Sequence, residues 1–184
     1  MSVLNIFADD APNEATLTTD DPIEIASALA AVGVCFEQWS ANQEIVEDAS
    51  QEDVIAAYQK DIDRLMKQGG YQSVDVISLA ADNPAKDELR KKFLDEHTHS
   101  EDEVRFFVRG DGLFYLHLEQ QVFAVLCEAG DLISVPADTT HWFDMGGEPN
   151  FTAIRLFINP EGWVANYTGD DIATRFPTYE ALKG

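Results

Sequence analysis

Glu96-His97-Thr98-His99-Ser100-Glu101-Asp102-Glu103 is the most informative stretch of this chain. Its pattern is H-x-H-x-x-x-E, and it contains two of the four histidines in the sequence. Residues i, i+2 and i+6 of an extended strand share one face, so a strand without a bulge would bring His97, His99 and Glu103 together. Two imidazoles and a carboxylate suit iron, nickel, manganese or zinc. The alternative interpretation is a polar surface loop.

A second stretch has the pattern Gly130-x5-Pro136-x-Asp138-x2-His141. An apolar run over 132–135 ends at the proline, and a short turn then leads to the histidine. This arrangement can return His141 across a barrel toward the first stretch. On an octahedral metal, four protein ligands leave two positions open, which suits a bidentate substrate. A structural zinc site is closed and usually richer in cysteine. We therefore predict an open metal site with four ligands: His97, His99, Glu103 and His141.

The composition limits the classes of partner. The formal net charge of −22 argues against nucleic acid and against an anionic membrane surface, because both attract lysine and arginine. No stretch approaches the roughly 20 apolar residues of a membrane span, and residues 1–10 lack a secretory-signal pattern. Two distant cysteines make no disulfide framework. We predict a cytoplasmic protein, and the like charges favour a monomer.

The order of helix and strand signals predicts one domain, residues 1–184. A helix is expected from Asp20-Asp21-Pro22 to about Val32, and another from the capping pair Ser50 and Asp53 to residues 69–70. The residues after position 7 read as a loop. Short strands are expected over 104–108, 113–118, 122–127, 132–135 and 151–158, with a turn at 109–112. Such spacing is typical of an antiparallel sandwich or barrel. We place N-terminal helices and strands in 1–95, packed on a metal-binding barrel core in 96–160.

Both stretches resemble the two motifs of the cupin superfamily. The first matches as His97-x-His99-x3-Glu103-x6-Gly110, although Lys91 stands where a leading glycine is usual. The second matches at Gly130, Pro136 and His141, and departs from the pattern at Asp138 and Met145. The departures leave the four ligands intact. The resemblance implies a mainly β fold with added helices, in which a cupin-type double-stranded β-helix (jelly-roll) barrel carries an N-terminal helical layer.

Longer stretches narrow the resemblance to the acireductone dioxygenase family. The similar stretches are 56–58, 70–72, 75–78, 93–107, 131–136, 141–145 and 149–155. The resemblance implies a methionine-salvage enzyme with one Fe(II) or Ni(II) per monomer, held by the four ligands named above. Its substrates are acireductone (1,2-dihydroxy-3-keto-5-methylthiopentene) and O2. With iron, the products are 2-keto-4-methylthiobutyrate and formate; with nickel, they are methylthiopropionate, formate and carbon monoxide. The sequence does not decide which metal is physiological.

Arg105 is the candidate catalytic residue, because it lies two positions past Glu103 on the same strand face. Basic residues are scarce from His97 onward, so average composition does not account for an arginine at this place. Its guanidinium can hydrogen-bond the enediol oxygens and favour their deprotonated form. The alternative is a surface arginine at a strand end.

Several other residues are predicted near the site. Glu96 and Asp102 flank ligands and can orient imidazoles, although solvated carboxylates are an equal alternative. Arg155 lies in an apolar strand, where a structural ion pair is the first interpretation. His117 is interpreted as a strand-face histidine outside the ligand set. Candidates for the pocket that takes the methylthio tail are Phe93, Phe107, Phe143 and Arg155.

Two other functions remain open at this point. One is a metal-binding cupin without catalysis, acting as a sensor or store. The other is a cupin sugar-phosphate isomerase, for which a phosphate would need several basic groups. Arg105 beside a complete ligand set favours the dioxygenase, because a sensor has no need to polarise a bound enediol.

Overall fold

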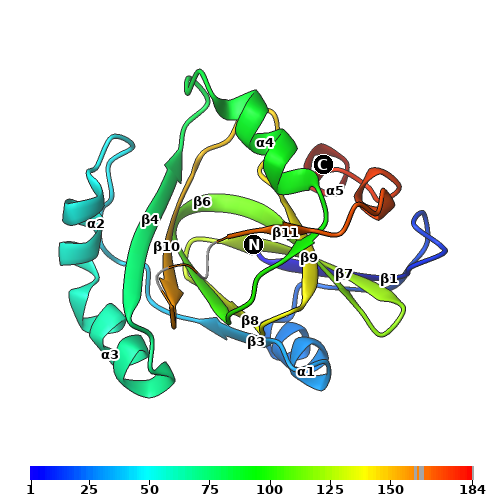
Figure 1. The fold of residues 1–184 in the computed structure, drawn as a ribbon, viewed down its shortest axis with the longest axis horizontal. Coiled ribbons are helices and arrows are strands. Elements are labelled where there is room, and N and C mark those ends of the chain that lie inside the picture. The colour runs from blue at the N-terminus through cyan, green and yellow to red at the C-terminus, as the bar shows by residue number, and fades with distance from the viewer. Residues whose placement is uncertain (160, 162–163, 184) are drawn as a thin grey trace.

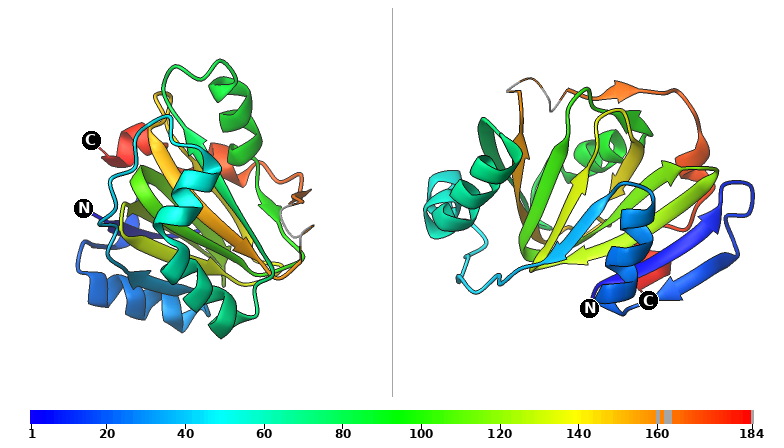
Figure 2. Two further views of the ribbon diagram at one scale, coloured as in Figure 1. Left: turned by 90° about the vertical axis from the view of Figure 1, so that its left-hand side faces the viewer. Right: turned by 90° about the horizontal axis from the view of Figure 1, so that it is seen from below.

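The longest strand, β6 (Glu103–Leu118), belongs to two sheets at once in the computed structural model, which describes residues 1–159, 161 and 164–183. Its first part pairs with β8 (Asp131–Val135) and β10 (Phe151–Phe157), and its second part pairs with β7 (Gln121–Glu128) and β9 (Thr140–Asp144). All of these pairings are antiparallel. The two sheets therefore curve around one interior, as Figures 1 and 2 show.

A bulge in β6 redirects its side chains. Opposite Thr152 and Ala153 of β10, the register passes from Arg109 to Phe107 and leaves Val108 without a partner. Because one extra residue reverses the alternation, Phe107 before the bulge and Phe114 after it both pack in the same core cluster. Glu103 and Arg105 lie four and two residues before Phe107 on the same strand, so their side chains also point inward. The bulge thus allows Glu103 and Arg105 in the first half of β6, and Phe114 in the second half, to face the same interior.

The turn expected at 109–112 is wrong, because β6 runs through these residues. Gly110 has φ +66, and a Cβ at this position would collide with the backbone carbonyl of Asn150. The glycine therefore serves the bulge and the close approach of the chain before β10, and it does not reverse the strand. A two-residue connection at Glu119 and Gln120, both with positive φ, makes the actual hairpin turn into β7.

The N-terminal residues contribute strands to the two sheets, in addition to the helices that cover them. β1 (Val3–Ala8) pairs with β7, β3 (Cys35–Gln38) with β8, and β4 (Ser73–Leu79) with β10. The loop expected after residue 7 is wrong: β2 (Ala15–Thr19) returns beside β1 as a hairpin. The positions of these strands depend on backbone pairing with strands far away in the sequence. Local sequence patterns do not reveal such pairing.

The helices cover the outside of the sheets (Figures 1 and 2). α1 (Pro22–Ala31) begins at the expected cap, where Asp21 accepts from the Ile23 amide. The helix expected from Ser50 to 69–70 is two helices, α2 (Gln51–Ala57) and α3 (Gln59–Gly69), which meet at Tyr58. Tyr58 is buried and leaves helical geometry so that its ring can pack edge-on against Phe106. Tertiary packing therefore overrides a continuous helical period.

The remaining elements close one end of the barrel. They are α4 (Lys86–Leu94), β5 (His97–Thr98), β11 (Asn166–Tyr167), a 3-10 helix (Ile172–Thr174) and α5 (Tyr179–Lys183). Arg90 of α4 makes a bidentate ion pair with the fully buried carboxylate of Asp144 on β9, which fixes the helix to the barrel. Figure 1 shows α4 and β11 near each other at this end. Among the described residues, no helix has the length and apolar character needed to cross a membrane.

Candidate metal centre

Three imidazoles meet at the end of the barrel that α4 and β11 cover. His97 is on β5, His141 is on β9, and the two residues are directly paired across the strands. His99 follows β5 by one residue. One ring nitrogen from each of the three lies within 4.8 Å of the others, and all three side chains are buried. The geometry thus forms a group that could hold a metal ion.

The strand does not run without interruption from His97 through His99 to Glu103, so strand alternation alone does not bring these residues together. β5 ends at Thr98, and β6 begins only at Glu103, so residues 99–102 are not strand. Two contacts shape this interruption: the His99 carbonyl accepts from the Asp138 amide, and the Asp102 carboxylate accepts from the Ala137 amide. The turn before His141 and the turn after His99 therefore hold each other in place, and tertiary contacts bring the ligand candidates together.

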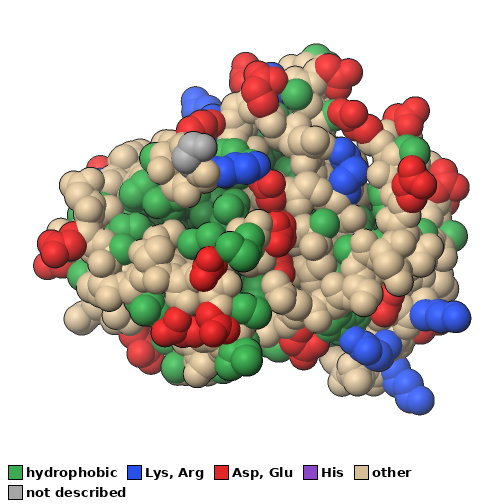
Figure 3. Space-filling model, turned by 180° about the vertical axis from the view of Figure 1, so that it is seen from behind, with side chains coloured by type: hydrophobic (Ala, Val, Ile, Leu, Met, Phe, Trp, Pro, Cys, Tyr) green, Lys and Arg blue, Asp and Glu red, His purple; other side chains and the backbone are tan. Residues whose placement is uncertain are grey.

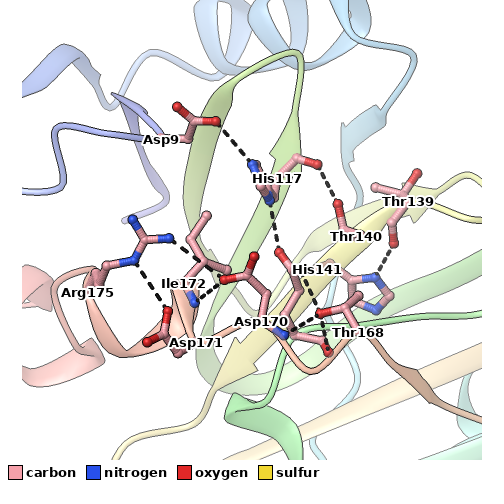
Figure 4. Close-up of polar contacts among 11 residues, drawn as sticks. Asp9, His117, Thr139, Thr140, His141, Thr168, Asp170, Asp171, Ile172 and Arg175 are labelled. Carbon is pink, nitrogen blue, oxygen red and sulfur yellow. Dashed lines mark hydrogen bonds and ion pairs between the residues drawn. The ribbon is translucent and has the colours of Figure 1, made fainter.

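The hydrogen bonds of the three imidazoles fix their tautomers. Each Nδ1 faces a backbone carbonyl oxygen, at 2.7 Å from Asp95, 3.0 Å from Val164 and 2.8 Å from Thr139. The last of these is visible in Figure 4. A carbonyl can only accept, so each Nδ1 carries the hydrogen. Each Nε2 therefore presents a lone pair to the centre of the site, as a metal ligand must.

Glu103 brings a fourth lone-pair donor to the same point. Its Oε2 lies 3.3 Å from Nε2 of His99 and 4.0 Å from Nε2 of His141. Among the described residues, neither this oxygen nor the Nε2 of His141 has a hydrogen-bond partner, and both atoms are buried. Lone pairs facing one another in a buried site repel unless a cation lies between them. Two ligands at about 2.1 Å from one metal lie about 3 Å apart, which is near the separation of Glu103 and His99.

Arg105 secures the carboxylate from the other side. Its Nε donates to Oε1 of Glu103 at 2.5 Å, and its guanidinium lies over the rings of Phe114 at 4.8 Å and Phe143 at 5.1 Å. The residue is only 4% exposed. Its Nη1 is buried and has no hydrogen-bond partner among the described residues. A buried guanidinium N–H without an acceptor is suited to binding an anionic oxygen.

Burial and nearby charges keep His97, Glu103 and His141 unprotonated at neutral pH. Burial and the neighbouring His97 lower the pKa of His141 to about 3, and burial lowers the pKa of His97. Burial alone would raise the pKa of Glu103, but the charge of Arg105 and the nearby imidazoles outweigh it and bring this pKa to about 2. These three groups can therefore bind a cation without first losing a proton.

A cavity of about 560 Å³ opens onto these residues. It lies among α4, β4, β6, β10 and the segment 164–167. Its volume is in the range of small-molecule sites, and it combines apolar walls with a few converging polar groups. The lining residues are Ile77, Leu89, Lys92, Phe93, His97, His99, Arg105, Arg155, Val164, Ala165 and Tyr167.

The pocket candidates from the sequence fall into two sets. Phe93 and Arg155 line the cavity. Phe107 and Phe143 are fully buried in the core behind it, where Phe143 packs edge-on against Phe93 at 6.2 Å. Arg155 makes a bidentate ion pair with Asp75, as the structural interpretation expected. The contribution of Ile77, Leu89, Lys92 and Tyr167 to the wall was missed, and no local motif marks these residues.

Glu96 is buried but does not touch a ligand imidazole through its carboxylate. That carboxylate accepts from Oγ1 of Thr168 at 2.8 Å and contacts Nδ1 of His117 at 2.9 Å. His117 reaches Asp9 on its other side, as Figure 4 shows, and lies outside the three-histidine group. Glu96 thus fastens the segment 164–168, whose Val164 carbonyl holds His99. Sequence reasoning missed this segment because no side chain in it carries a metal-ligand signal.

The fold and this centre define a double-sheet β-barrel protein with a histidine metal site. The sequence profile of the ARD/ARD' family matches residues 4–165. An acireductone dioxygenase of Marinobacter nauticus is 58% identical over 184 residues, which cover 100% of this chain and 99% of the relative. One from Pseudomonas paraeruginosa is 59% identical over 180 residues, or 98% of this chain and 99% of the relative. This chain therefore belongs to the ARD/ARD' family.

A solved structure confirms the fold. It is described as acireductone dioxygenase from Bacillus anthracis with a cadmium ion in the active centre. It superposes with a TM-score of 0.78 at 32% identity, and the match covers 91% of this chain and 98% of that chain. The expectation of a mainly β, cupin-type barrel with added helices is thus confirmed.

Asp138 lies at a position where the cupin pattern usually has glycine. Its φ is +61, a conformation that aspartate tolerates better than most residues.

The metal-free protein is expected to lose stability in acid. A histidine in the unfolded chain has a pKa of 6.5, whereas the pKa of folded His141 is about 3. Between these values the unfolded chain binds a proton that the folded chain does not, so the free energy of unfolding falls as the pH drops through this window. The loss is on the order of a few kcal/mol. Glu103 adds a loss of the same sign between pH 4.5 and about 2.

Urea unfolding of the metal-free protein at several pH values from 7.5 to 4.5 measures this loss. His141→Gln is expected to flatten the slope, because it removes the imidazole whose pKa burial lowers. A free energy of unfolding that stays constant over this range would contradict the burial of unprotonated ligands.

Thr168→Val is expected to weaken metal binding about tenfold without unfolding the protein, because it removes the hydroxyl that fastens the segment 164–168 to Glu96. The segment keeps its backbone bonds to Glu96 and to β5, so the orientation of His99 is loosened and not abolished. Competition titration against a chromophoric chelator measures the affinity. Thr16→Val, at a hydroxyl bonded to the Ile6 carbonyl far from the centre, is the matched control. Equal affinities of the two variants would show that the segment does not position His99.

Proposed function

We propose that this protein is a metal-dependent dioxygenase that cleaves acireductone with O2 in methionine salvage. The observation that carries the proposal is the convergence of four lone-pair donors, from three imidazoles and Glu103, beside the unpartnered Nη1 of Arg105. His97, His99 and Arg105 of this group line the cavity. The names of the relatives, which are acireductone dioxygenases at 58% and 59% identity, support the same activity.

The donor set fits one Fe(II) or Ni(II) ion. Nitrogen and carboxylate oxygen ligands suit both metals, and no cysteine takes part that would favour a closed zinc site. His97, His99, Glu103 and His141 would hold the ion and leave two positions for substrate. When bound, the metal supplies chelation of the enediol oxygens and access to O2 chemistry. Because the same ligands accept either metal, we propose that the supplied metal selects the products.

Arg105 binds and orients the substrate in this proposal. Its Nη1 is the buried donor that lacks a partner, and its Nε bond to Glu103 fixes the plane of the guanidinium. A hydrogen bond from this fixed cation to an enediol oxygen lowers the free energy of the deprotonated form relative to the neutral one. The same residue therefore both positions the substrate and favours the electron-rich form that reacts with O2.

The apolar side of the cavity would take the methylthio tail. Ile77, Leu89 and Phe93 provide this wall, and Phe143 supports Phe93 from behind. Each methylene group that leaves water here contributes roughly 0.8 kcal/mol to binding. Arg155 would border the pocket rather than react, since Asp75 already holds its guanidinium. Glu96 and Asp102 would act only by holding the loops around the ligands.

The first experiment loads the metal-free protein separately with Fe(II) and Ni(II). Acireductone is generated without oxygen, O2 is then admitted, and the products are assayed. We expect 2-keto-4-methylthiobutyrate and formate from the iron protein. From the nickel protein we expect methylthiopropionate, formate and carbon monoxide. If neither form consumes acireductone faster than a no-protein control, a non-catalytic metal-binding role replaces this proposal.

Arg105→Gln is expected to keep the metal and to lose about 10²–10³-fold in kcat, because a preorganised charged donor is removed from the reacting oxygens. Arg109→Gln is the control on the same strand, where the arginine side chain bonds Thr152 and Asn150 outside the cavity. Metal content and steady-state rates are measured for both variants. Equal rates for the two would remove Arg105 from the mechanism.

A further inference from the structure

The cavity at the metal centre has a charge opposite to that of the whole chain. The sequence has 34 Asp and Glu residues against 12 Lys and Arg residues. Acidic side chains recur over the face drawn in Figure 3, where a group of basic ones gathers at the lower right edge. Among the described residues that line the cavity, three are cationic (Lys92, Arg105 and Arg155) and none is Asp or Glu. Such a reversal in a strongly acidic protein points to an anionic ligand.

The two arginines are already committed to carboxylates. Arg105 donates to Glu103, and Arg155 makes two hydrogen bonds to Asp75, at 2.9 and 2.7 Å. Arg105 and Arg155 also lie directly opposite each other in the pairing of β6 with β10. Like charges at such a position are destabilising unless each is compensated. The two carboxylates supply that compensation, so these arginines leave little free charge to attract a distant anion.

Lys92 differs from both arginines. Its only ion-pair partner among the described residues is Glu88, one turn earlier on α4, at 3.2 Å. The two side chains are 58% and 74% exposed. An exposed pair at this helical spacing contributes only a few tenths of a kcal/mol, so an incoming anion can replace Glu88 at little cost. The lysine backbone is held in place, because its carbonyl accepts from the Tyr167 hydroxyl across the cavity wall.

We propose that Lys92 recruits the anionic substrate to the cavity mouth, exchanging its contact with Glu88 for the substrate oxygens. This inference rests on the proposed function, which supplies an enediolate as the ligand. The net charge of −22 repels such an anion at long range. A weakly paired ammonium group at the entrance raises the local concentration of the anion within a Debye length, which is about 10 Å at 0.1 M salt. Lys92 therefore acts on substrate capture and not on the chemical step.

Lys91 offers a matched control, because it carries the same charge on the same helix but faces a different cavity. That second cavity lies between α4 and the C-terminal segment, and Lys91 lines it together with Leu94 and Phe176. Lys91→Gln and Lys92→Gln change the net charge of the protein equally. Only the second variant changes the charge at the metal-site cavity.

The test uses the metal-loaded full chain at ionic strengths of about 0.02 M and about 0.5 M, between which the Debye length falls several-fold. We expect Lys92→Gln to raise KM for acireductone roughly three- to tenfold at low salt, to leave kcat within about twofold, and to approach wild type at high salt. Glu88→Gln is expected to lower KM, because the lysine is released. Lys91→Gln is expected to match wild type throughout.

A second readout does not depend on turnover. Isothermal titration with oxalate, a bidentate dianion, is expected to show the same salt-dependent weakening for Lys92→Gln and none for Lys91→Gln. The inference would be overturned if the two lysine variants had equal oxalate affinities and equal KM values at low salt. A kcat defect of Lys92→Gln that is independent of salt would also overturn it. If wild type lacks turnover but only Lys92→Gln weakens oxalate, the recruiting role stands while the proposed reaction fails.

Discussion

Four lone pairs that face each other inside the barrel are the constraint on which this structure depends. Three imidazoles present Nε2 to one point because a backbone carbonyl accepts from each Nδ1. Glu103 adds an oxygen 3.3 Å from the nearest of these nitrogens. Such an arrangement is repulsive by itself and becomes favourable only around a cation. The carbonyls that fix it come from three separate segments of the chain, so the site exists only when the whole end of the barrel has folded.

The bulge in β6 gives this centre its surroundings. By reversing the alternation after Val108, it allows one strand to place Glu103 and Arg105 at the metal centre and Phe114 in the adjoining core. Arg105 then lies over the Phe114 ring while it holds Glu103. A regular strand would have turned one of these two groups outward. The geometry of the backbone thus couples the electrostatic stabilisation of the carboxylate to the packing of the barrel.

Acidic and basic side chains occupy different parts of this protein. Carboxylates cover the surface, while the cavity carries cations whose charges are balanced to different degrees. Buried or half-buried carboxylates neutralise the two arginines, and an exposed, weak contact leaves Lys92 available. This gradation separates two tasks that positive charge can perform. Fixed guanidinium groups orient a bound anion, whereas a loosely held ammonium group attracts one from solution.

The amino-acid sequence alone determined the class of fold and predicted the ligand set of the site. The spacing of His97, His99 and Glu103, with His141 after a proline turn, indicated the ligand set, and short apolar runs indicated a β-barrel. The tertiary structure decided what local patterns do not encode. In the tertiary structure, residues 99–102 are not strand, and β6 continues through Gly110, where a turn was expected. N-terminal strands also pair into both sheets. The tertiary structure also brought α4 and the segment 164–168 over the metal site, because hydrogen bonds between residues far apart in sequence leave no periodic signal in either partner.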